Sequence, residues 1–214
     1  MDLGRQLIDE LAIAPPACVA LVGAGGKTTL MRALYEEGRR RGWQVLAGTT
    51  TKVARAQVAD IADFVHGGIE GDKLTGVAPG SAELRGPGLV VVEADGARSK
   101  LVKAPDAHEP VLPSGVSHVV AVIGADALDR VIEDVAHRPM LVAAVCGCGP
   151  YERLTVERAA ALLTSRRGGR KAVPVGAVFA VVITRVGPRQ QELAQRLAAA
   201  LAAAGVASVL SPLQ

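Results

Sequence analysis

Residues 17–29 read ACVALVGAGGKTT, and this stretch decides the fold. Its first six residues (17–22) are all apolar, which is typical of a strand buried on both faces of a parallel sheet. Three glycines and an alanine follow at 23–26. Lys27 then opens a segment whose apolar spacing predicts a helix over about 28–41. A strand, a glycine-rich loop and a helix in this order predict a phosphate-binding backbone.

Each residue type in the loop suits that chemistry. Glycines allow the positive φ angles and the close approach that converging backbone N–H groups need around a phosphate. The Lys27 ammonium is placed to reach the β- and γ-phosphates, and the Thr28 hydroxyl to bind Mg²⁺. We therefore predict nucleotide contacts from the loop and the first turn of the helix: Gly23, Ala24, Gly25, Gly26, Lys27, Thr28 and Thr29.

The loop is shorter than the commonest phosphate-binding form. That form has a glycine five residues before the Gly-Lys pair, where this chain has Leu21. The first glycine is Gly23, which gives a Gly-x-x-Gly-Lys-Thr pattern of the kind found in Mur ligases. An ordinary glycine turn is the alternative, but Gly-Gly-Lys-Thr-Thr between a strand and a helix favours nucleotide binding.

Two other strand ends carry polar residues. Leu89–Val92 is an apolar run followed by Glu93 and Asp95, and phosphate-binding proteins hold Mg²⁺ with a carboxylate at such a position. Both acids are metal candidates beside Thr28, although Asp95 with the next glycine also fits a turn. Thr51 and Lys52 follow another predicted strand and are further candidates for nucleotide contact, the alternative being a polar turn with a threonine cap.

The rest of the chain alternates apolar strands with helical patterns. This arrangement predicts a three-layer α/β fold, P-loop NTPase-like, with a mostly parallel sheet and helices on both faces. The expected helices are a short one at the N-terminus and segments near 53–62, 126–134, 138–145, 155–165 and 189–204. The expected strands are 17–22, 43–47, 63–66, 89–92, 119–123, 177–183 and 206–210, and loops are expected at 67–88 and 95–116.

Composition limits the class of protein. The 214 residues suit one domain, 1–214, and with 50% hydrophobic residues the chain is not globally disordered. The formal net charge of +3 and 2% aromatic content argue against nucleic-acid binding by aromatic stacking. No apolar run reaches the length of a membrane span, so no membrane partner is expected. Three cysteines and no secretory signal predict a reduced, cytoplasmic protein.

The segment 95–116 follows the metal-side strand and is long for a loop, which predicts a functional role. Lys103 could neutralise a transferring phosphoryl group, and His108 and Glu109 could serve in acid–base chemistry or substrate contact. The predicted catalytic residues are Lys27, Asp95, Lys103, His108 and Glu109. A hydrogen-bonded loop histidine is the simpler alternative for His108. Cys146 and Cys148 offer too few ligands for a zinc site and fit small residues at a helix end.

Several blocks together resemble the YqeC-type proteins, which are accessory proteins for selenium-dependent molybdenum hydroxylases, also called selenium cofactor biosynthesis proteins. The blocks are Val22–Thr29, Thr49–Lys52, Val92–Ala97, Lys103–Pro105, His108–Pro113, Gly124–Leu128 and His137–Pro139. The Lys-Ala-Pro and His-Glu-Pro blocks are the most specific. The resemblance implies a P-loop NTPase fold and a role in maturing a selenium-containing molybdenum enzyme, with a molybdopterin-type cofactor or the hydroxylase itself as a possible partner.

The chain departs from the family pattern after the late strand, where an Asn-Lys-x-Asp motif for guanine is expected. This chain has Thr184-Arg185-Val186-Gly187 there, with no carboxylate to receive guanine N–H groups. ATP is therefore at least as well supported as GTP. Three functions fit these patterns: an Mg²⁺-dependent NTPase or phosphoryl-transfer enzyme, an adaptor with a regulatory P-loop, and a small-molecule kinase or Mur-like ATP-dependent ligase.

Overall fold

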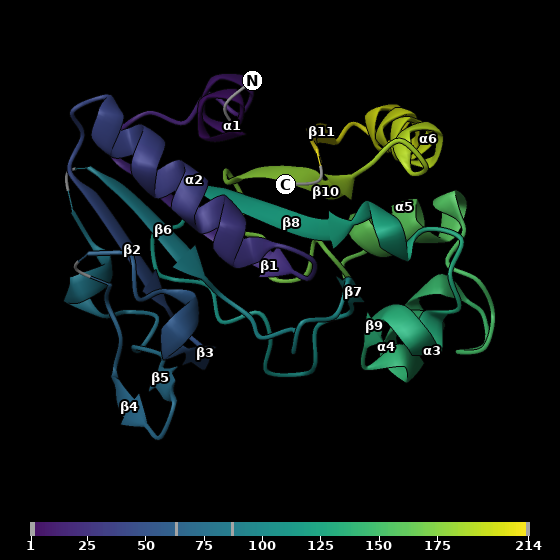
Figure 1. Cartoon of the computed structure of the whole chain (residues 1–214), viewed down its shortest axis with the longest axis horizontal. Coiled ribbons are helices and arrows are strands. Elements are labelled where there is room, and N and C mark those ends of the chain that lie inside the picture. Colours follow the sequence, from purple (N-terminus) through teal and green to yellow (C-terminus); the bar gives the residue numbers. More distant parts are fainter. Residues whose placement is uncertain (1–2, 63, 87, 213–214) are drawn as a thin grey trace.

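A six-stranded parallel sheet lies at the centre of the computed structural model, which describes residues 3–62, 64–86 and 88–212 (Figure 1). The strand order is β11-β10-β8-β1-β6-β2, and every pair in it is parallel. The strands are β1 (Ala17–Gly23), β2 (Val45–Thr49), β6 (Leu89–Glu93), β8 (His118–Gly124), β10 (Val178–Val186) and β11 (Ala207–Pro212). This confirms the predicted α/β class.

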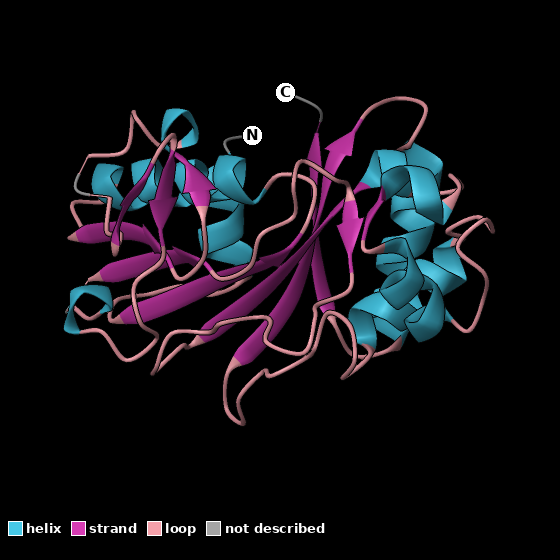
Figure 2. Cartoon of the chain, turned by 90° about the horizontal axis from the view of Figure 1, so that it is seen from below, coloured by secondary structure: helices cyan, strands magenta, loops and turns pink. Residues whose placement is uncertain are grey.

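Helices cover both faces of this sheet (Figure 2). On β1, Val19 and Leu21 pack with α1 (Leu3–Glu10) and α2 (Lys27–Arg40), whereas Ala20 and Val22 belong to the core on the opposite face. That second core includes α3 (Ile132–Val135), α4 (Pro139–Cys146), α5 (Val156–Thr164) and α6 (Gln191–Ala203). Because strand side chains alternate, burial on both sides explains why the strands read as continuous apolar runs.

Small residues bring the layers close together. Gly4 of α1 lies against α2 so closely that a Cβ atom there would sit 2.1 Å from the carbonyl oxygen of Ala33. Any side chain at this position would push the two helices apart. The glycine-rich, aromatic-poor composition therefore matches tight packing between the helices.

The segment after β2 differs from the prediction. Instead of a helix over 53–62, it forms β3 (Val53–Ala54) and a 3₁₀ turn, η1 (Arg55–Gln57). The expected loop over 67–88 contains β4 (Gly68–Glu70), β5 (Lys73–Thr75) and η2 (Ala82–Leu84). β5 pairs with both β3 and β4 in a small antiparallel sheet. The helix prediction was wrong because residues 53–54 bond to a hairpin that lies about twenty positions later in the chain.

Three smaller predictions also need correction. The strand expected at 63–66 is only a bridge between Val65 and Gly48, and Asp63 lies outside the described residues. The helix expected over 126–134 is a 3₁₀ turn, η3 (Ala125–Ala127), followed by the four-residue α3. Within the loop 95–116, β7 (Val102–Lys103) pairs in parallel with β9 (Ala136–His137).

The topology marks one place on the sheet for a ligand. From β1 the chain first builds β2 and β6 on one side, then β8, β10 and β11 on the other. In open parallel sheets such a reversal leaves a crevice at the carboxyl ends of the strands. The glycine loop after β1 lies at that point.

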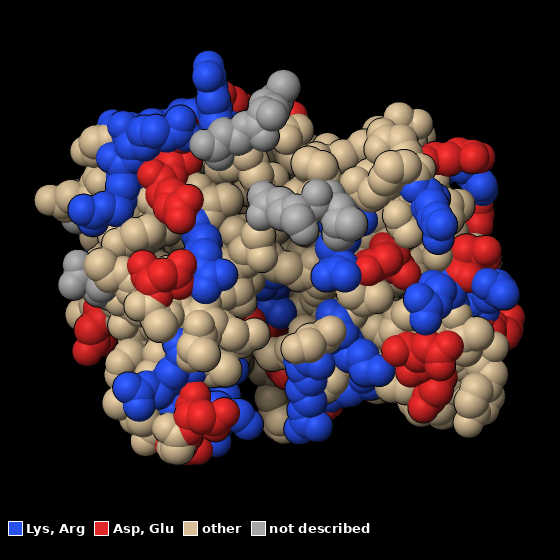
Figure 3. All heavy atoms as spheres, viewed as in Figure 1, with Lys and Arg blue, Asp and Glu red and all other residues tan. Residues whose placement is uncertain are grey.

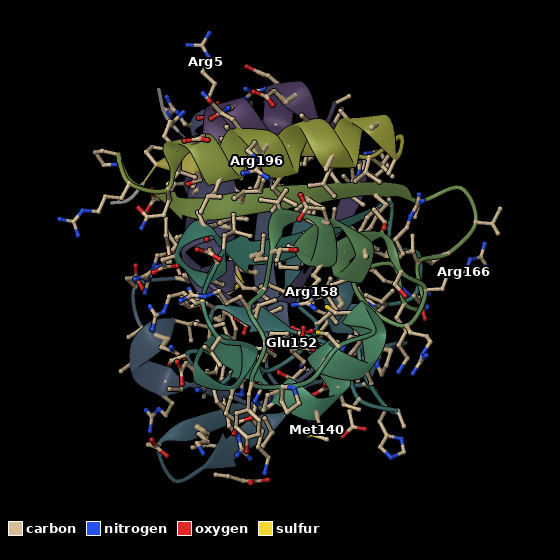
Figure 4. The ribbon with its side chains drawn as sticks, turned by 90° about the vertical axis from the view of Figure 1, so that its right-hand side faces the viewer. Arg5, Met140, Glu152, Arg158, Arg166 and Arg196 are labelled. Carbon is tan, nitrogen blue, oxygen red and sulfur yellow. The ribbon has the colours of Figure 1, made fainter. Side chains whose placement is uncertain are left out.

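The face covered by α5 and α6 carries surface ion pairs. Figure 4 shows Arg158 of α5 beside Glu152, whose carboxylate it pairs with, and Arg196 of α6 above them. Arg196 pairs with Glu157 at 3.4 Å. Within the described chain, every helix is too short or too polar to cross a membrane.

Candidate functional site

The glycine loop is fixed between two strands. Gly23, Gly25 and Gly26 have φ angles of 87°, 92° and 136°, in the region that favours glycine. The Ala24 amide donates to the Val122 carbonyl at 2.9 Å and anchors the loop to β8. The tight turn therefore depends on glycine, as the sequence pattern indicates.

Lys27 is folded back over this loop and is 4% exposed. Its Nζ donates to the Gly23 carbonyl at 2.7 Å. The same nitrogen lies 3.2 Å from Oδ1 of Asp95 and 3.6 Å from Oε1 of Glu93. A buried lysine needs such partners, because an unpaired charge away from water is costly.

The two acids at the end of β6 have different surroundings. Glu93 accepts a hydrogen bond from the Thr28 hydroxyl at 3.2 Å and lines the cleft described below. Asp95 lies beneath the floor of the cleft, where its Oδ2 accepts from the Gly23 amide at 3.0 Å. Burial raises the pKa of Glu93 above its ordinary value, and the Asp95 charge adds to this, while Lys27 opposes it.

The donor set at Thr28 and Glu93 fits Mg²⁺, which prefers oxygen ligands and commonly takes one or two from a protein and the rest from water and phosphates. Asp95 Oδ1 takes no hydrogen bond within the described chain, although the Lys27 ammonium faces it. Among the described residues, there is no group of three or more His, Cys, Asp and Glu side chains of the kind that holds a metal by itself.

A chain of alternating charges continues from Asp95. The Lys103 side chain is 0% exposed, with its Nζ 3.4 Å from Asp95 Oδ2 and 2.7 Å from Glu109 Oε2. Arg138 then donates two hydrogen bonds to Glu109, at 2.6 and 3.3 Å. These contacts form a continuous row from the glycine loop to Arg138, in the order Lys27, Asp95, Lys103, Glu109 and Arg138.

This chain of charges determines how Glu109 and its neighbour His137 titrate. Burial by itself would raise the pKa of Glu109, but hydrogen bonds from Arg138 and Lys103 outweigh it and lower the pKa to about 2. Burial lowers the pKa of His137 below its ordinary value, and the positive charges of Arg138 and Lys103 lower it further. At neutral pH the carboxylate is charged and the neutral imidazole is favoured.

The cleft has a volume of about 980 Å³ and opens at the carboxyl ends of the strands. Figure 3 shows it as a hollow below the centre of that view, with Lys and Arg side chains on both sides. Glu93 and Glu109 are the acidic residues among its described walls. The basic residues there are Lys27, Arg32, Lys52, Lys73, Arg98, Lys100, Arg138 and Arg185. The surplus of positive charge suits an anionic ligand.

The structure brings most of the predicted residues together. The cleft is lined by Gly25, Gly26, Lys27, Thr28, Thr29, Thr51, Lys52, Glu93 and Glu109. Gly23, Ala24, Asp95 and Lys103 are not among the described lining residues. The Lys103 ammonium contacts that lining through the Glu109 carboxylate and the Gly96 carbonyl. His108 is exposed and outside the described lining, separate from the other candidates.

Sequence reasoning missed Thr184, at the end of β10. Its hydroxyl donates to the carbonyls of Gly25 and of Ile123, the latter at 3.1 Å, and so holds the glycine loop from the β10 side. Its position at a carboxyl strand end was the available signal. Arg98 and Lys73 were also missed, because nothing in the local sequence shows that they face the same cleft.

Cys146 and Cys148 lie away from this cleft. Cys146 ends α4, and Gly147 follows it with a φ of 68°, as at a helix C-terminus. Burial raises the pKa of the Cys146 thiol to about 12, which keeps it protonated. This agrees with a structural position at a helix end.

Fold and site together define a three-layer α/β protein with a P-loop-like strand, loop and helix at the switch point of its sheet. The chain belongs to the YqeC family: residues 19–140 match the family described as "YqeC protein". It is also 29% identical over 220 residues to "Uncharacterized protein YqeC" of Escherichia coli (strain K12), covering 91% of this chain and 86% of that protein. No solved structure matches the chain. Family membership suggests an accessory role.

Proposed function

We propose that the cleft binds a nucleoside triphosphate with Mg²⁺ and that the protein hydrolyses it or transfers its terminal phosphoryl group. The observation that carries this proposal is that Lys27, Thr28 and Glu93 lie together beside the glycine loop and line the cleft. A flexible cation, a hydroxyl and a carboxylate beside converging amides are the groups that phosphoryl transfer uses.

Each of these groups has a defined part. The Gly25 and Gly26 amides and the N-terminus of α2 receive the phosphates, since both present partial positive charge. The Gly23 and Ala24 amides already donate to Asp95 and to the Val122 carbonyl. Thr28 and Glu93 would hold Mg²⁺, which supplies neutralisation of phosphate charge when it is bound. Lys27 exchanges its carboxylate partners for phosphate oxygens, and Asp95 keeps the loop in place through the Gly23 amide.

The acid–base step needs a group that can accept a proton at neutral pH. Glu109 suits it poorly, because its pKa is about 2 and its oxygens are taken by Arg138 and Lys103. His137 lines the same cleft and has a lowered pKa, so its neutral ring can accept a proton. Lys103 positions the carboxylates of Asp95 and Glu109. His108 is exposed, and its role is to contact a ligand that approaches this side of the loop.

For the cellular role, we propose that this reaction assists maturation of the cofactor of a selenium-containing molybdenum hydroxylase. The support is the family resemblance of the Lys103–Pro105 and His108–Pro113 blocks and membership of the YqeC family. A molybdopterin-type cofactor or the hydroxylase would be the partner.

Calorimetric titration of the full chain with Mg–ATP and with Mg–GTP tests the proposal. We expect binding of at least one nucleotide, and Lys27→Ala should weaken it by at least about tenfold, since a charge-assisted contact is lost. Arg5→Ala is the matched control: Arg5 projects outward from α1 (Figure 4), and its pairing with Asp9 is on the surface. It is not among the residues that line the cleft.

Turnover then separates the classes of function. Phosphate release that Lys27→Ala abolishes supports an enzyme. Nucleotide binding with no turnover supports an adaptor whose P-loop is regulatory. If wild-type protein binds neither nucleotide, the proposal is wrong.

A further inference from the structure

We infer that the cleft has a second subsite, opposite the base of the nucleotide, that binds a small molecule carrying a phosphate group. This inference rests on the proposed nucleotide site and adds its co-substrate. The residues that define the subsite are Lys73 on β5 and Arg98 in the loop after β6.

Topology separates the two halves of the cleft. Thr184 and Arg185 at the end of β10, with Ser211 and Pro212 at the end of β11, line it on one side of β1. We place the base in this half, beside Thr184, whose hydroxyl donates to the Gly25 carbonyl of the glycine loop. The ends of β6 and β2 lie on the other side of β1, and Lys73 and Arg98 belong to segments that follow those two strands. A nucleotide extending from the glycine loop toward β10 leaves that half of the cleft free.

Most cations of the cleft already have partners. Arg32 makes two hydrogen bonds to the Asp60 carboxylate, at 2.7 and 2.8 Å. Lys52 pairs with Glu70 at 2.5 Å. Arg185 pairs with Asp126 at 2.7 Å. These charges are largely balanced before any ligand arrives.

Lys73 and Arg98 differ, because neither side chain makes a hydrogen bond or ion pair within the part of the chain that the structure describes. In the small sheet, Lys73 stands opposite Glu70 in the ladder between β4 and β5. The carboxylate of Glu70 is bound to Lys52 instead. Glu70 therefore neutralises Lys52 and not Lys73, and the charge of Lys73 remains for a ligand.

The loop that carries Arg98 has an uncommon backbone. Arg98 and Ser99 have φ angles of 47° and 58°, a region that non-glycine residues seldom adopt twice in succession. The turn closes with a hydrogen bond from the Lys100 amide to the Ala97 carbonyl at 3.0 Å. Such conformations persist where the surroundings impose them and are frequent at ligand-binding loops.

Size and charge agree with two ligands. A volume of about 980 Å³ is at the upper end of the roughly 300–1,000 Å³ that ligand pockets span. An arginine fork and a lysine ammonium suit a phosphate, which accepts several charge-assisted hydrogen bonds. The negative charge of a second phosphate-bearing molecule thus neutralises Lys73 and Arg98, which lie in the half of the cleft that the nucleotide leaves free.

Amide NMR of the full chain tests this subsite. The protein is saturated with Mg²⁺ and a non-hydrolysable ATP analogue and then titrated with inorganic phosphate at constant ionic strength. We expect saturable shifts at residues 72–74 and 97–99. In Lys73→Ala/Arg98→Ala the phosphate affinity should fall by at least about tenfold, while the affinity for the analogue stays within about threefold of wild type.

A charge-matched control, Arg5→Ala/Arg39→Ala, should keep wild-type phosphate affinity. Acetate at the same ionic strength should bind more weakly than phosphate, and equal binding would overturn the assignment to a phosphate group. Unchanged phosphate affinity in Lys73→Ala/Arg98→Ala, with the analogue still bound, overturns the subsite alone. If wild-type protein does not bind the analogue, the nucleotide proposal fails and the subsite fails with it.

Discussion

At the scale of single residues, Lys103 shows how burial changes the role of a side chain. Its ammonium lies between Asp95 and Glu109 and is closed off from solvent. We predict that Lys103→Met lowers the free energy of unfolding by about 2–3 kcal/mol, because Asp95 and Glu109 each lose one cationic partner. Lys27 still faces Asp95, and Arg138 still binds Glu109. Urea denaturation followed by circular dichroism measures this.

Lys52 provides the control for that prediction. Its pair with Glu70 is more than half exposed on both sides. Surface pairs contribute about 0–1 kcal/mol, so Lys52→Met should cost no more than this. Equal costs for the two variants would contradict the role given to Lys103.

The roles of single residues were only partly predictable from the sequence, because a role can depend on how deeply the side chain is buried. The sequence predicts that Lys27 contacts the phosphates because it belongs to the glycine loop, and that Lys103 does so because its loop follows the metal-side strand. The structure sets Lys103 under the floor, since β7 pairs with β9 from a segment more than thirty residues later. No local pattern contains that pairing.

At the scale of elements, the glycine loop depends on room as well as on backbone angle. A Cβ on Gly25 would lie 2.5 Å from the Gly124 nitrogen and 2.9 Å from the Leu101 carbonyl oxygen. We predict that Gly25→Ala destabilises the protein by about 2 kcal/mol or more, from strained φ and overpacking together. It should also abolish nucleotide binding in the calorimetric titration.

Gly42, at the end of α2, separates the two causes. Its φ is 76°, yet no described atom outside its chain neighbours lies within 4 Å of the position that a Cβ would take there. Gly42→Ala should therefore cost only the backbone strain, about 1 kcal/mol, and keep nucleotide affinity. If both alanine variants unfold at the same urea concentration, close packing at Gly25 is not the cause.

The loop that carries Glu109 should respond to acid. The folded pKa of this carboxyl, about 2, lies below its ordinary value of 4.5. The group therefore stabilises the fold above its ordinary pKa, and this contribution is lost as the pH falls from about 4.5 toward 2.

We predict that wild-type protein loses unfolding free energy more steeply than Glu109→Gln between about pH 5 and pH 3. Urea denaturation at pH 7, 5, 4 and 3 gives the two profiles. All other carboxylates are common to both proteins, so parallel profiles would refute the assignment.

Elements were predictable where the pattern is local. Strands buried on both faces read as continuous apolar runs, and for that reason β1, β6, β8 and β10 lie where the sequence placed them. The segment 53–75 has short strands paired over a distance, and its mixed polar sequence resembles a weak helix. Its small sheet, which forms one wall of the cleft, could be found only from the folded chain.

At the scale of the whole molecule, the sheet order decides where a base can lie. The ends of β10 and β11 come together beside the glycine loop, although Thr184 and Ser211 are far apart in the sequence. The residues Thr184–Gly187 present no carboxylate, and the nearby Asp126 accepts a hydrogen bond from Arg185 at 2.7 Å. Oδ1 of Asp126 is buried and takes no hydrogen bond within the described chain, but Asp126 is not among the described residues that line the cleft. The described lining at this edge therefore presents no carboxylate to guanine N1–H and N2–H.

We predict that the dissociation constants for Mg–ATP and Mg–GTP differ by less than about tenfold, or about 1.4 kcal/mol. Strong discrimination requires buried polar groups that the wrong base leaves unpaired, and this edge of the sheet offers few. Calorimetric titration of one preparation with ATP, GTP and CTP measures the ratios, with Arg5→Ala as a control for general charge. A preference of about a hundredfold or more for one purine would mean that Arg185 or Asp126 rearranges to read it.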